Sequence, residues 1–259
     1  MSKLVEVERD RGVARVWLNR PERHNALNHE FAEELIESFH AVAHDETTSV
    51  VVLGGRGKSF CAGADIATMR DSGGLSQDEN IAEAVRLGGL FASLAGIPKP
   101  VVARIHGNVF GGGVGLMSAC DIVVAAADST FAISEVRLGI IPALISPYLI
   151  RRMGDARARE YMLTGERFGA AQAFQIGLVG HVVPTEELDA KVEERVLALA
   201  SGGPVAQARI KMLLELFGDA GWEEYRGALP RILSEVRAGE EAREGLTAFL
   251  EKRKPAWVK

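Results

Sequence analysis

The stretch FGGGVGLMSACD, residues 110–121, sets three consecutive glycines and Gly115 in front of an apolar run that ends in Asp121. The β-branched segment 100–105 precedes it, so the pattern predicts a strand, a loop and then a helix over residues 111–119. A helix that begins on bare backbone presents unpaired N–H groups and the positive end of its dipole. The glycines therefore serve either tight packing or the close approach of a ligand to the backbone.

A second loop of small residues, SFCAGADI at 59–66, follows a predicted strand over residues 49–53. If N–H groups of both loops point at one atom, they form an oxyanion hole; tight helix packing is the alternative. Neither loop fits a nucleotide. GRGKS at 55–59 lacks the first P-loop glycine, because Val52 occupies that position, and GGGVG lacks the spacing of the dinucleotide fingerprint.

Outward from these loops, strand and helix patterns alternate through the first two-thirds of the chain, and helical patterns fill the rest. Further strands are predicted over residues 4–8, 13–18, 122–125, 130–133 and 178–182, with 106–110 as a loop. Helices are predicted over residues 28–44, 77–94, 155–163, 170–175, 186–200, 204–217 and 239–253. The alternation favours an α/β fold.

Composition excludes several classes of protein. The chain has 259 residues, 47% of them hydrophobic, and a net charge of −5, which argues against a nucleic-acid binder. Two cysteines, Cys61 and Cys120, suggest no disulfide framework. His24, His106 and His181 lack metal-ligand spacing, so no metal is predicted. No signal segment and no membrane span are expected, and we predict a cytoplasmic protein.

Several segments together resemble the crotonase, or enoyl-CoA hydratase/isomerase, superfamily: NRPERHNALN (19–28), SFCAGADI (59–66), GNVFGGGVGLMSACDI (107–122), FAISEVRLGIIP (131–142) and AFLEKRKPAW (248–257). The resemblance implies an α/β fold, a crotonase-like spiral of ββα units over residues 1–197 that holds the acyl-CoA site. A helical C-terminal trimerisation region follows over residues 198–259. It also implies a homotrimer or a hexamer of paired trimers, an acyl-CoA thioester as substrate, and no cofactor beyond that coenzyme A.

The resemblance also assigns site residues. By position, the backbone N–H groups of Ala64 and Gly112 would hold the thioester oxygen, and Glu135 would act as the acid-base group. The other substrate contacts that it implies are Arg23, Ala26, Leu27, Ala62, Asp65, Ile66, Phe249 and Lys252. For Asp65, hydrogen bonding that fixes the loop is the stronger interpretation. Cys61 is interpreted as a structural residue.

The chain departs from the superfamily pattern at Gly115, where the best-known hydratases carry a first glutamate. Glu135 must then serve both proton transfers of a hydration, with help from water, or shift a double bond as an isomerase does. Gly115 is predicted to leave room for a branched acyl group. If the segment is extended, Arg137 shares a face with Glu135 and would bind a substrate carboxylate; a surface arginine is the alternative.

A shorter segment, EVRLGIIPALISPYLIRRMG (135–154), is similar to bacterial 3-methylglutaconyl-CoA hydratases. We therefore predict interconversion of 3-methylglutaconyl-CoA and 3-hydroxy-3-methylglutaryl-CoA. Ser146 and Tyr148 would line the acyl pocket, unless they are a helix-start residue and a core residue. The alternatives are an enoyl-CoA delta-isomerase with a single glutamate, and a catalytically silent acyl-CoA-binding or RNA-binding family member.

Overall fold

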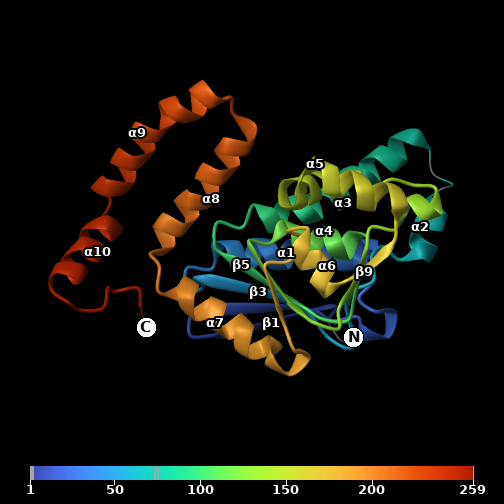
Figure 1. Cartoon of the computed structure of the whole chain (residues 1–259), viewed down its shortest axis with the longest axis horizontal. Coiled ribbons are helices and arrows are strands. Elements are labelled where there is room, and N and C mark those ends of the chain that lie inside the picture. The colour runs from blue at the N-terminus through green and yellow to red at the C-terminus, as the bar shows by residue number, and fades with distance from the viewer. Residues whose placement is uncertain (1–2, 73, 75, 259) are drawn as a thin grey trace.

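Two sheets and the helices around them make up the protein (Figure 1), a computed structural model that describes residues 3–72, 74 and 76–258. The strands are β1 (Val5–Asp10), β2 (Val13–Leu18), β3 (Val50–Gly55), β4 (Ser59–Cys61), β5 (Val101–Ile105), β6 (Asn108–Phe110), β7 (Ile122–Ala126), β8 (Thr130–Ala132), β9 (Arg167–Gly169) and β10 (His181–Val183). The helices are α1 (His29–His44), α2 (Ile66–Ser72), α3 (Gln77–Ala95), α4 (Gly112–Ala119), α5 (Ser146–Thr164), α6 (Ala170–Gln175), α7 (Leu188–Ala200), α8 (Pro204–Asp219), α9 (Trp222–Ala238) and α10 (Glu240–Leu250), with short 3-10 helices η1 (Pro21–Arg23), η2 (Glu135–Leu138) and η3 (Thr185–Glu187).

Successive turns of a spiral generate the two sheets. One sheet has the order β1-β2-β3-β5-β7-β10 and the other β4-β6-β8-β9. Strands β3, β5 and β7 pair in parallel in the first sheet, and β4, β6 and β8 pair in parallel in the second. Each turn thus places one strand in each sheet before a helix closes it. The predicted α/β spiral of ββα units is confirmed.

Alternation along the strands explains how the first sheet is buried on both faces. Val51 and Leu53 of β3 belong to the main core, whereas Val50 and Val52 pack in a second cluster with Val192 of α7. Successive side chains of a strand point to opposite faces, so a continuous β-branched run is needed where both faces are covered. Helix α7 covers one face, while α1, α3 and α4 pack on the other.

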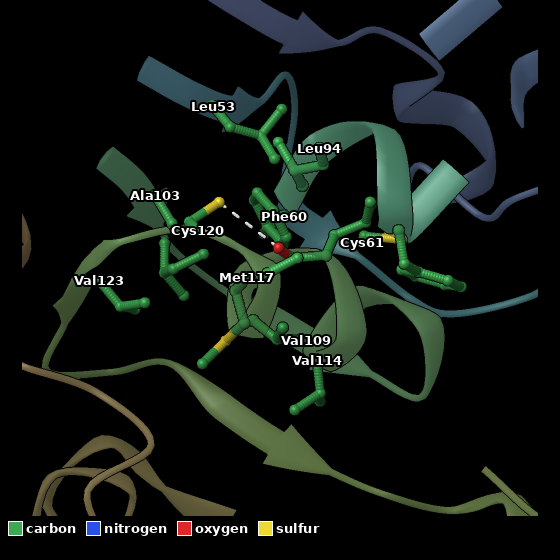
Figure 2. Close-up of a cluster of buried hydrophobic side chains, with 14 of the residues drawn as sticks. Leu53, Phe60, Cys61, Leu94, Ala103, Val109, Val114, Met117, Cys120 and Val123 are labelled. Atoms are coloured by element: carbon green, nitrogen blue, oxygen red, sulfur yellow. Dashed lines mark hydrogen bonds between the residues drawn. The ribbon is translucent and has the colours of Figure 1, made fainter. Parts of the chain in front are cut away.

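Helix α4 is packed almost without solvent contact. Its residues Gly113 to Ala119 are all buried, and Figure 2 shows Val114 and Met117 among side chains of the strands and loops around it. The Cys120 thiol lies 3.4 Å from the Leu116 carbonyl oxygen, at the end of the helix (Figure 2). The helix that follows the glycine stretch is therefore anchored in the core, which holds its first turn in a fixed place.

Several elements differ from the sequence-based prediction. Strand β6 lies in the segment predicted as a loop, and β10 begins at His181, later than expected. Helix α9 was not predicted at all, since Gly227 and Pro230 lie in its interior and both disfavour helix. Helix α5 starts at Ser146, earlier than predicted, and is kinked at Gly154, whose φ of 74° is not helical; the predicted helix over residues 155–163 is the part that follows the kink.

The last three helices stand away from the two sheets (Figure 1). Helices α8 and α9, whose residues are all described, contain no buried residue. Large apolar side chains are exposed there, among them Phe217, Trp222 and Phe249. A helical C-terminal region is thus present as predicted. The division between residues 197 and 198 stays a prediction; it falls within α7, and α8 begins at Pro204.

Candidate active site

A cavity of about 230 Å³ lies at the N-terminus of α4. Six of the predicted site residues line it: Leu27, Ala62, Ala64, Ile66, Gly112 and Glu135. The remaining lining is mostly apolar and comes from α2, α3, the end of η2 and the segment between η2 and α5: Met69, Leu87, Phe91, Leu138, Ile140, Ile141, Pro142, Ala143, Leu144 and Ile145. The structure therefore brings together both small-residue loops and one carboxylate around a single apolar space.

The backbone of the first loop is held so that one N–H remains available. Leu27 forms a parallel bridge with Ala64, in which the Leu27 N–H donates to Gly63 O at 2.7 Å and the Asp65 N–H donates to Leu27 O at 2.8 Å. In such a bridge the neighbours of Ala64 make both bonds, so its own N–H points to the other side. Among the described residues, the Ala64 N–H donates no backbone hydrogen bond.

The second loop supplies another unpaired donor. Gly112 is the first residue of α4, so its N–H has no acceptor within the helix. Gly111 precedes it with a φ of 47°, a left-handed conformation that favours glycine. A Cβ on Gly111 would also lie 2.9 Å from Glu135 Oε1, and one on Gly113 would clash with Cys61. The glycines thus serve tight packing as well as close approach to the backbone.

Glu135 is the one ionisable side chain among the described residues that line the cavity. Its side chain lies beside Gly111, at the start of η2. Oε2 is buried and has no hydrogen-bond partner among the described residues. Burial raises the pKa of this carboxyl above its ordinary value, against a smaller opposing effect of a hydrogen bond from its own backbone N–H. A proton is therefore held more readily here than by a carboxyl in water.

Comparison with known proteins decides the family. The model of the enoyl-CoA hydratase/isomerase family matches residues 8–259. This chain belongs to the enoyl-CoA hydratase/isomerase family. The predicted superfamily and the predicted enzyme class, a hydratase-type lyase, are confirmed.

Relatives of this enoyl-CoA hydratase/isomerase family member match it along nearly its whole length. A putative enoyl-CoA hydratase of Thermus thermophilus is 36% identical and the match covers 97% of this chain and 99% of the relative. A 2,3-dehydroadipyl-CoA hydratase of Escherichia coli is 33% identical over 98% of both chains. The crystal structure of an enoyl-CoA hydratase from Shewanella pealeana has a TM-score of 0.94 and 36% identity, covering 98% of this chain and 96% of that one.

Gly115 does not leave the space that its sequence predicts. A Cβ on Gly115 would clash with Ile145 and would lie 2.9 Å from Phe91 Cε1. Both side chains are almost fully buried. The prediction that this glycine makes room for an acyl branch is wrong, because side chains from α3 and from the residue before α5 fill the space. In this family member, packing closes the position instead.

Arg137 does not line the cavity, and the shared face with Glu135 on which its predicted role rested is absent, so the role stays a prediction without that support. The segment after Glu135 is the 3-10 helix η2, not an extended strand. Residues i and i+2 of a helix point in different directions, so they share no face. The Arg137 side chain is exposed, and its Nε donates to the Thr164 carbonyl oxygen at 3.4 Å. The alternative interpretation, a surface arginine, describes it.

Ser146 and Tyr148 were predicted as acyl-pocket residues, and neither lines the cavity with Glu135. The Ser146 hydroxyl donates to the Ala143 carbonyl oxygen at 2.8 Å, at the start of α5. Tyr148 lines a separate cavity together with Ser118 and Arg151. Ser146 is therefore a helix-start residue, and Tyr148 is a partly buried residue whose ring centroid lies 6.3 Å from that of Phe91.

The predicted coenzyme A contacts remain predictions, and the structure shows where they lie. Arg23 is exposed at the end of η1, Ala26 is partly buried beside the first loop, and Phe249 and Lys252 are exposed at the end of α10. Asp65 fixes its loop. Its carboxylate accepts from Arg20 at 3.0 Å and from the Ala67 N–H at 3.1 Å. Partial burial raises the pKa of Asp65, but these bonds outweigh it and lower the pKa.

Cys61 and Asn25 are buried beside the first loop and do not line the cavity. The Cys61 thiol is buried, which raises its pKa to about 12, so no thiolate is available for nucleophilic attack. Asn25 is fully buried and was not identified as a functional residue by sequence. The one signal that could have pointed to Asn25 is its residue type. Among residues other than glycine, Asn is one of those that most often adopt a positive φ, and Asn25 has a φ of 55°.

The described part of the chain carries neither a metal-binding cluster nor a helix that could span a membrane. No group of three or more His, Cys, Asp or Glu side chains in it could hold a metal ion. None of its helices is both long enough and apolar enough to span a membrane.

Proposed function

We propose that this enzyme adds water reversibly across the 2,3-double bond of an enoyl-CoA thioester. The N–H groups of Ala64 and Gly112 donate to the thioester oxygen, and Glu135 transfers the protons. The observation that carries the proposal is the convergence of two unpaired backbone donors and one desolvated carboxyl on a single apolar cavity. Donors fixed before the reaction stabilise the charge that develops on the thioester oxygen.

The proposed reaction balances with Glu135 alone. Its carboxylate takes a proton from water as the water oxygen bonds to the β-carbon. The π electrons of the double bond move onto the thioester as an enolate, which the two N–H groups stabilise. Glu135 then returns the proton to the α-carbon and is a carboxylate again. A raised pKa suits this double role, because an acid-base group works best when its pKa is near the working pH.

The cavity lining supports an apolar acyl group. Apart from Glu135, its side chains beyond the loops are those of Leu, Ile, Met, Phe, Pro, Ala and Ser134. The finer proposal from sequence is the hydration of 3-methylglutaconyl-CoA to 3-hydroxy-3-methylglutaryl-CoA. Two arguments for it no longer hold, because side chains fill the space at Gly115 and Arg137 does not line the cavity. Its support is the similarity of segment 135–154 and a relative named for a carboxylated acyl chain. We therefore place a straight apolar 2-enoyl-CoA first and 3-methylglutaconyl-CoA second.

A double-bond isomerase is the second candidate function, and the single ionisable side chain in the cavity favours it. One carboxylate can remove a proton from the α-carbon of a 3-enoyl thioester and return it to the γ-carbon. No water is consumed in this reaction, and the thioester enolate is the same.

A panel of acyl-CoA thioesters separates these activities. Crotonyl-CoA, 2-hexenoyl-CoA and 3-methylglutaconyl-CoA lose their conjugated absorbance when water adds, whereas 3-hexenoyl-CoA gains it when the double bond moves. We expect kcat/KM to be highest for 2-hexenoyl-CoA. A preference for 3-methylglutaconyl-CoA would restore the finer proposal, turnover of 3-hexenoyl-CoA alone would establish the isomerase, and no turnover at all would reject both.

We further propose that the chain assembles as a homotrimer or a pair of trimers. Exposed apolar side chains on α8, α9 and α10 support this, since helices without buried residues gain their packing from another surface. Light scattering of the purified protein tests it: a monomer mass at micromolar concentration would contradict the proposal.

A further inference from the structure

Asn25 is a fully buried polar residue that touches no part of the cavity, yet its side chain is bonded on every side. We propose that Asn25 is a positioning residue that aims the Ala64 N–H at the thioester oxygen. The inference rests on the proposed role of Ala64 as a donor. Burying the Asn25 amide costs free energy of desolvation, which its hydrogen bonds must offset, and the backbone at Asn25 is left-handed, with a φ of 55°.

The amide of Asn25 joins two stretches of backbone. Its Nδ2 donates to the carbonyl oxygens of Arg56 at 2.9 Å, Ser59 at 2.9 Å and Phe60 at 3.0 Å. Its Oδ1 accepts from the Arg20 N–H at 2.8 Å. The three carbonyls belong to the turn between β3 and β4 and to β4 itself, which leads directly into the loop of Ala64. The side chain thus ties the residues after β2 to the strand that enters the site.

The segment that contains Asn25 then grips the loop on both sides of Ala64. The Ala62 N–H donates to His24 O at 2.9 Å, before Ala64, and the bridge between Leu27 and the neighbours of Ala64 follows it. The Cys61 thiol lies 3.0 Å from Asn25 O and adds a contact at the end of β4. Residues 24–27 therefore set the direction of the Ala64 N–H, and the Asn25 amide fixes where these residues lie.

The other donor depends on different contacts. Gly112 follows Gly111, whose N–H donates to Ala132 O at 2.9 Å, and α4 is anchored in the core. The two halves meet because β4 pairs with β6, with Ser59 opposite Asn108. Asn25 donates to the Ser59 carbonyl oxygen, so it acts at the strand pairing that sets the position of the Ala64 N–H relative to the Gly112 N–H. Loss of its amide should turn Ala64 away while Gly112 stays in place.

Two substitutions test the inference. Asn25→Gly keeps the positive φ and deletes the amide, and Asn25→Asp keeps the shape and Oδ1 but replaces the donor. Thr48→Ala is the matched control, because Thr48 is a buried hydroxyl that donates to Asp45 at 2.9 Å and lines none of the cavities described above. We expect both Asn25 variants to lower kcat for crotonyl-CoA by about 100-fold, the scale of losing one oxyanion donor, with KM changed little. The control keeps its kcat.

A vibrational measurement separates positioning from general stability. Butyryl-CoA labelled with 13C at the thioester carbonyl binds without reacting, and polarisation by the two N–H groups lowers its carbonyl frequency in the wild type. In Asn25→Gly and Asn25→Asp the frequency should move back towards that of free butyryl-CoA, and in Thr48→Ala it should stay. The inference would be overturned if the carbonyl frequency in the folded Asn25 variants equalled that in the wild type. It would also be overturned if their kcat equalled that of the control.

The same measurement distinguishes the inference from the proposed function. If the wild type leaves the butyryl-CoA carbonyl unpolarised, the oxyanion role of Ala64 and Gly112 is wrong and the inference fails with it. If the wild type polarises the carbonyl and the Asn25 variants do so equally, only the inference is wrong. Melting curves of all variants show which of them are folded. Asn25→Asp buries a carboxyl against three carbonyl oxygens, so Asn25→Gly, which buries no charge, serves if Asn25→Asp does not fold.

Discussion

Glu135 and Ile145 line the same cavity but are set there in different ways. The carboxyl of Glu135 is desolvated, lies against the bare backbone of Gly111, and has a buried oxygen with no partner among the described residues. Ile145 packs with Phe91 over Gly115 and leaves no space there. The cavity wall at Glu135 thus contains a buried carboxyl oxygen without a hydrogen-bond partner among the described residues, whereas the wall at Ile145 is closed by side-chain packing. The difference teaches that Glu135 is the one side chain, among the described residues of the lining, on which the proposed proton transfer can depend.

The largest expected effect comes from removing that side chain's charge. Glu135→Gln keeps the shape and deletes the acid-base group, so kcat should fall by about 1,000-fold, within the usual range for such a group. Steady-state kinetics on the most active thioester of the panel measures it, with circular dichroism as the check of folding. Near-normal turnover would show that chemistry is not concentrated on Glu135.

The next largest effect should come from the backbone donor beside it. Gly112→Pro is compatible with the first position of a helix but deletes the N–H, so kcat should fall by at least about 100-fold while KM changes less. Gly112→Ala is the control, because it keeps the N–H and its Cβ would only press on Leu27 Cδ1 at 3.1 Å. Equal losses in both variants would assign the effect to crowding rather than to the donor.

The closed wall at Ile145 can be opened to sharpen the contrast. Gly115→Glu should destabilise the protein by about 1–3 kcal/mol, the cost of overpacking, because its Cβ meets Ile145 and Phe91. In the double variant Gly115→Glu/Ile145→Ala the clash with Ile145 Cγ2 is removed, although Cβ of residue 145 and Phe91 Cε1 stay at 2.9 Å from the added Cβ, so the two changes should be coupled by about 1 kcal/mol or more. Denaturant unfolding of both single variants and the double variant measures the coupling, and strict additivity would contradict the packing described here.

The pH dependence should reveal the desolvated carboxyl. Burial raises the pKa of Glu135 above its ordinary 4.5, so the acid limb of kcat/KM, where the ionised base is needed, should have its midpoint above that pH. Folding stability changes with pH in the opposite direction to activity. The folded state holds this proton more tightly, so wild-type stability falls relative to Glu135→Gln as pH rises from 4.5 through the raised pKa. Parallel stability curves for the two proteins would argue against a raised pKa.

The smallest effect is expected from Arg137, which belongs to neither the Glu135 wall nor the Ile145 wall of the cavity. Arg137→Ala removes an exposed side chain on η2, which is two residues from Glu135 in sequence but does not line the cavity. Stability should change by no more than about 0.5 kcal/mol, and the ratio of kcat/KM for crotonyl-CoA and 3-methylglutaconyl-CoA should stay the same. A selective fall in kcat/KM for 3-methylglutaconyl-CoA relative to crotonyl-CoA would return Arg137 to the site.

Much of the site was predictable because its signals are local in sequence. Small residues after β-branched runs predicted both loops, and motif position assigned Ala64, Gly112 and Glu135 to what is one cavity. Prediction failed where the conformation of a neighbouring segment decided the outcome. Arg137 was misplaced because η2 is helical rather than extended, and α9 was missed because its interior Gly and Pro oppose a helix.

By itself, the sequence determined the family and the α/β spiral and assigned Ala64, Gly112 and Glu135 to what is one cavity, because each depends on short patterns of side-chain size, polarity and backbone freedom. Only the tertiary structure decided that Gly115 is closed rather than open. That answer depends on Ile145, thirty residues away in sequence, and on Phe91 from α3, which reach the same point through the packing of α3, α4 and α5. Likewise, the amide of Asn25 acquires its role only when β4 folds beside it. Steric exclusion and hydrogen bonding act over a few ångströms, so residues distant in sequence affect a site only once the fold has brought them there.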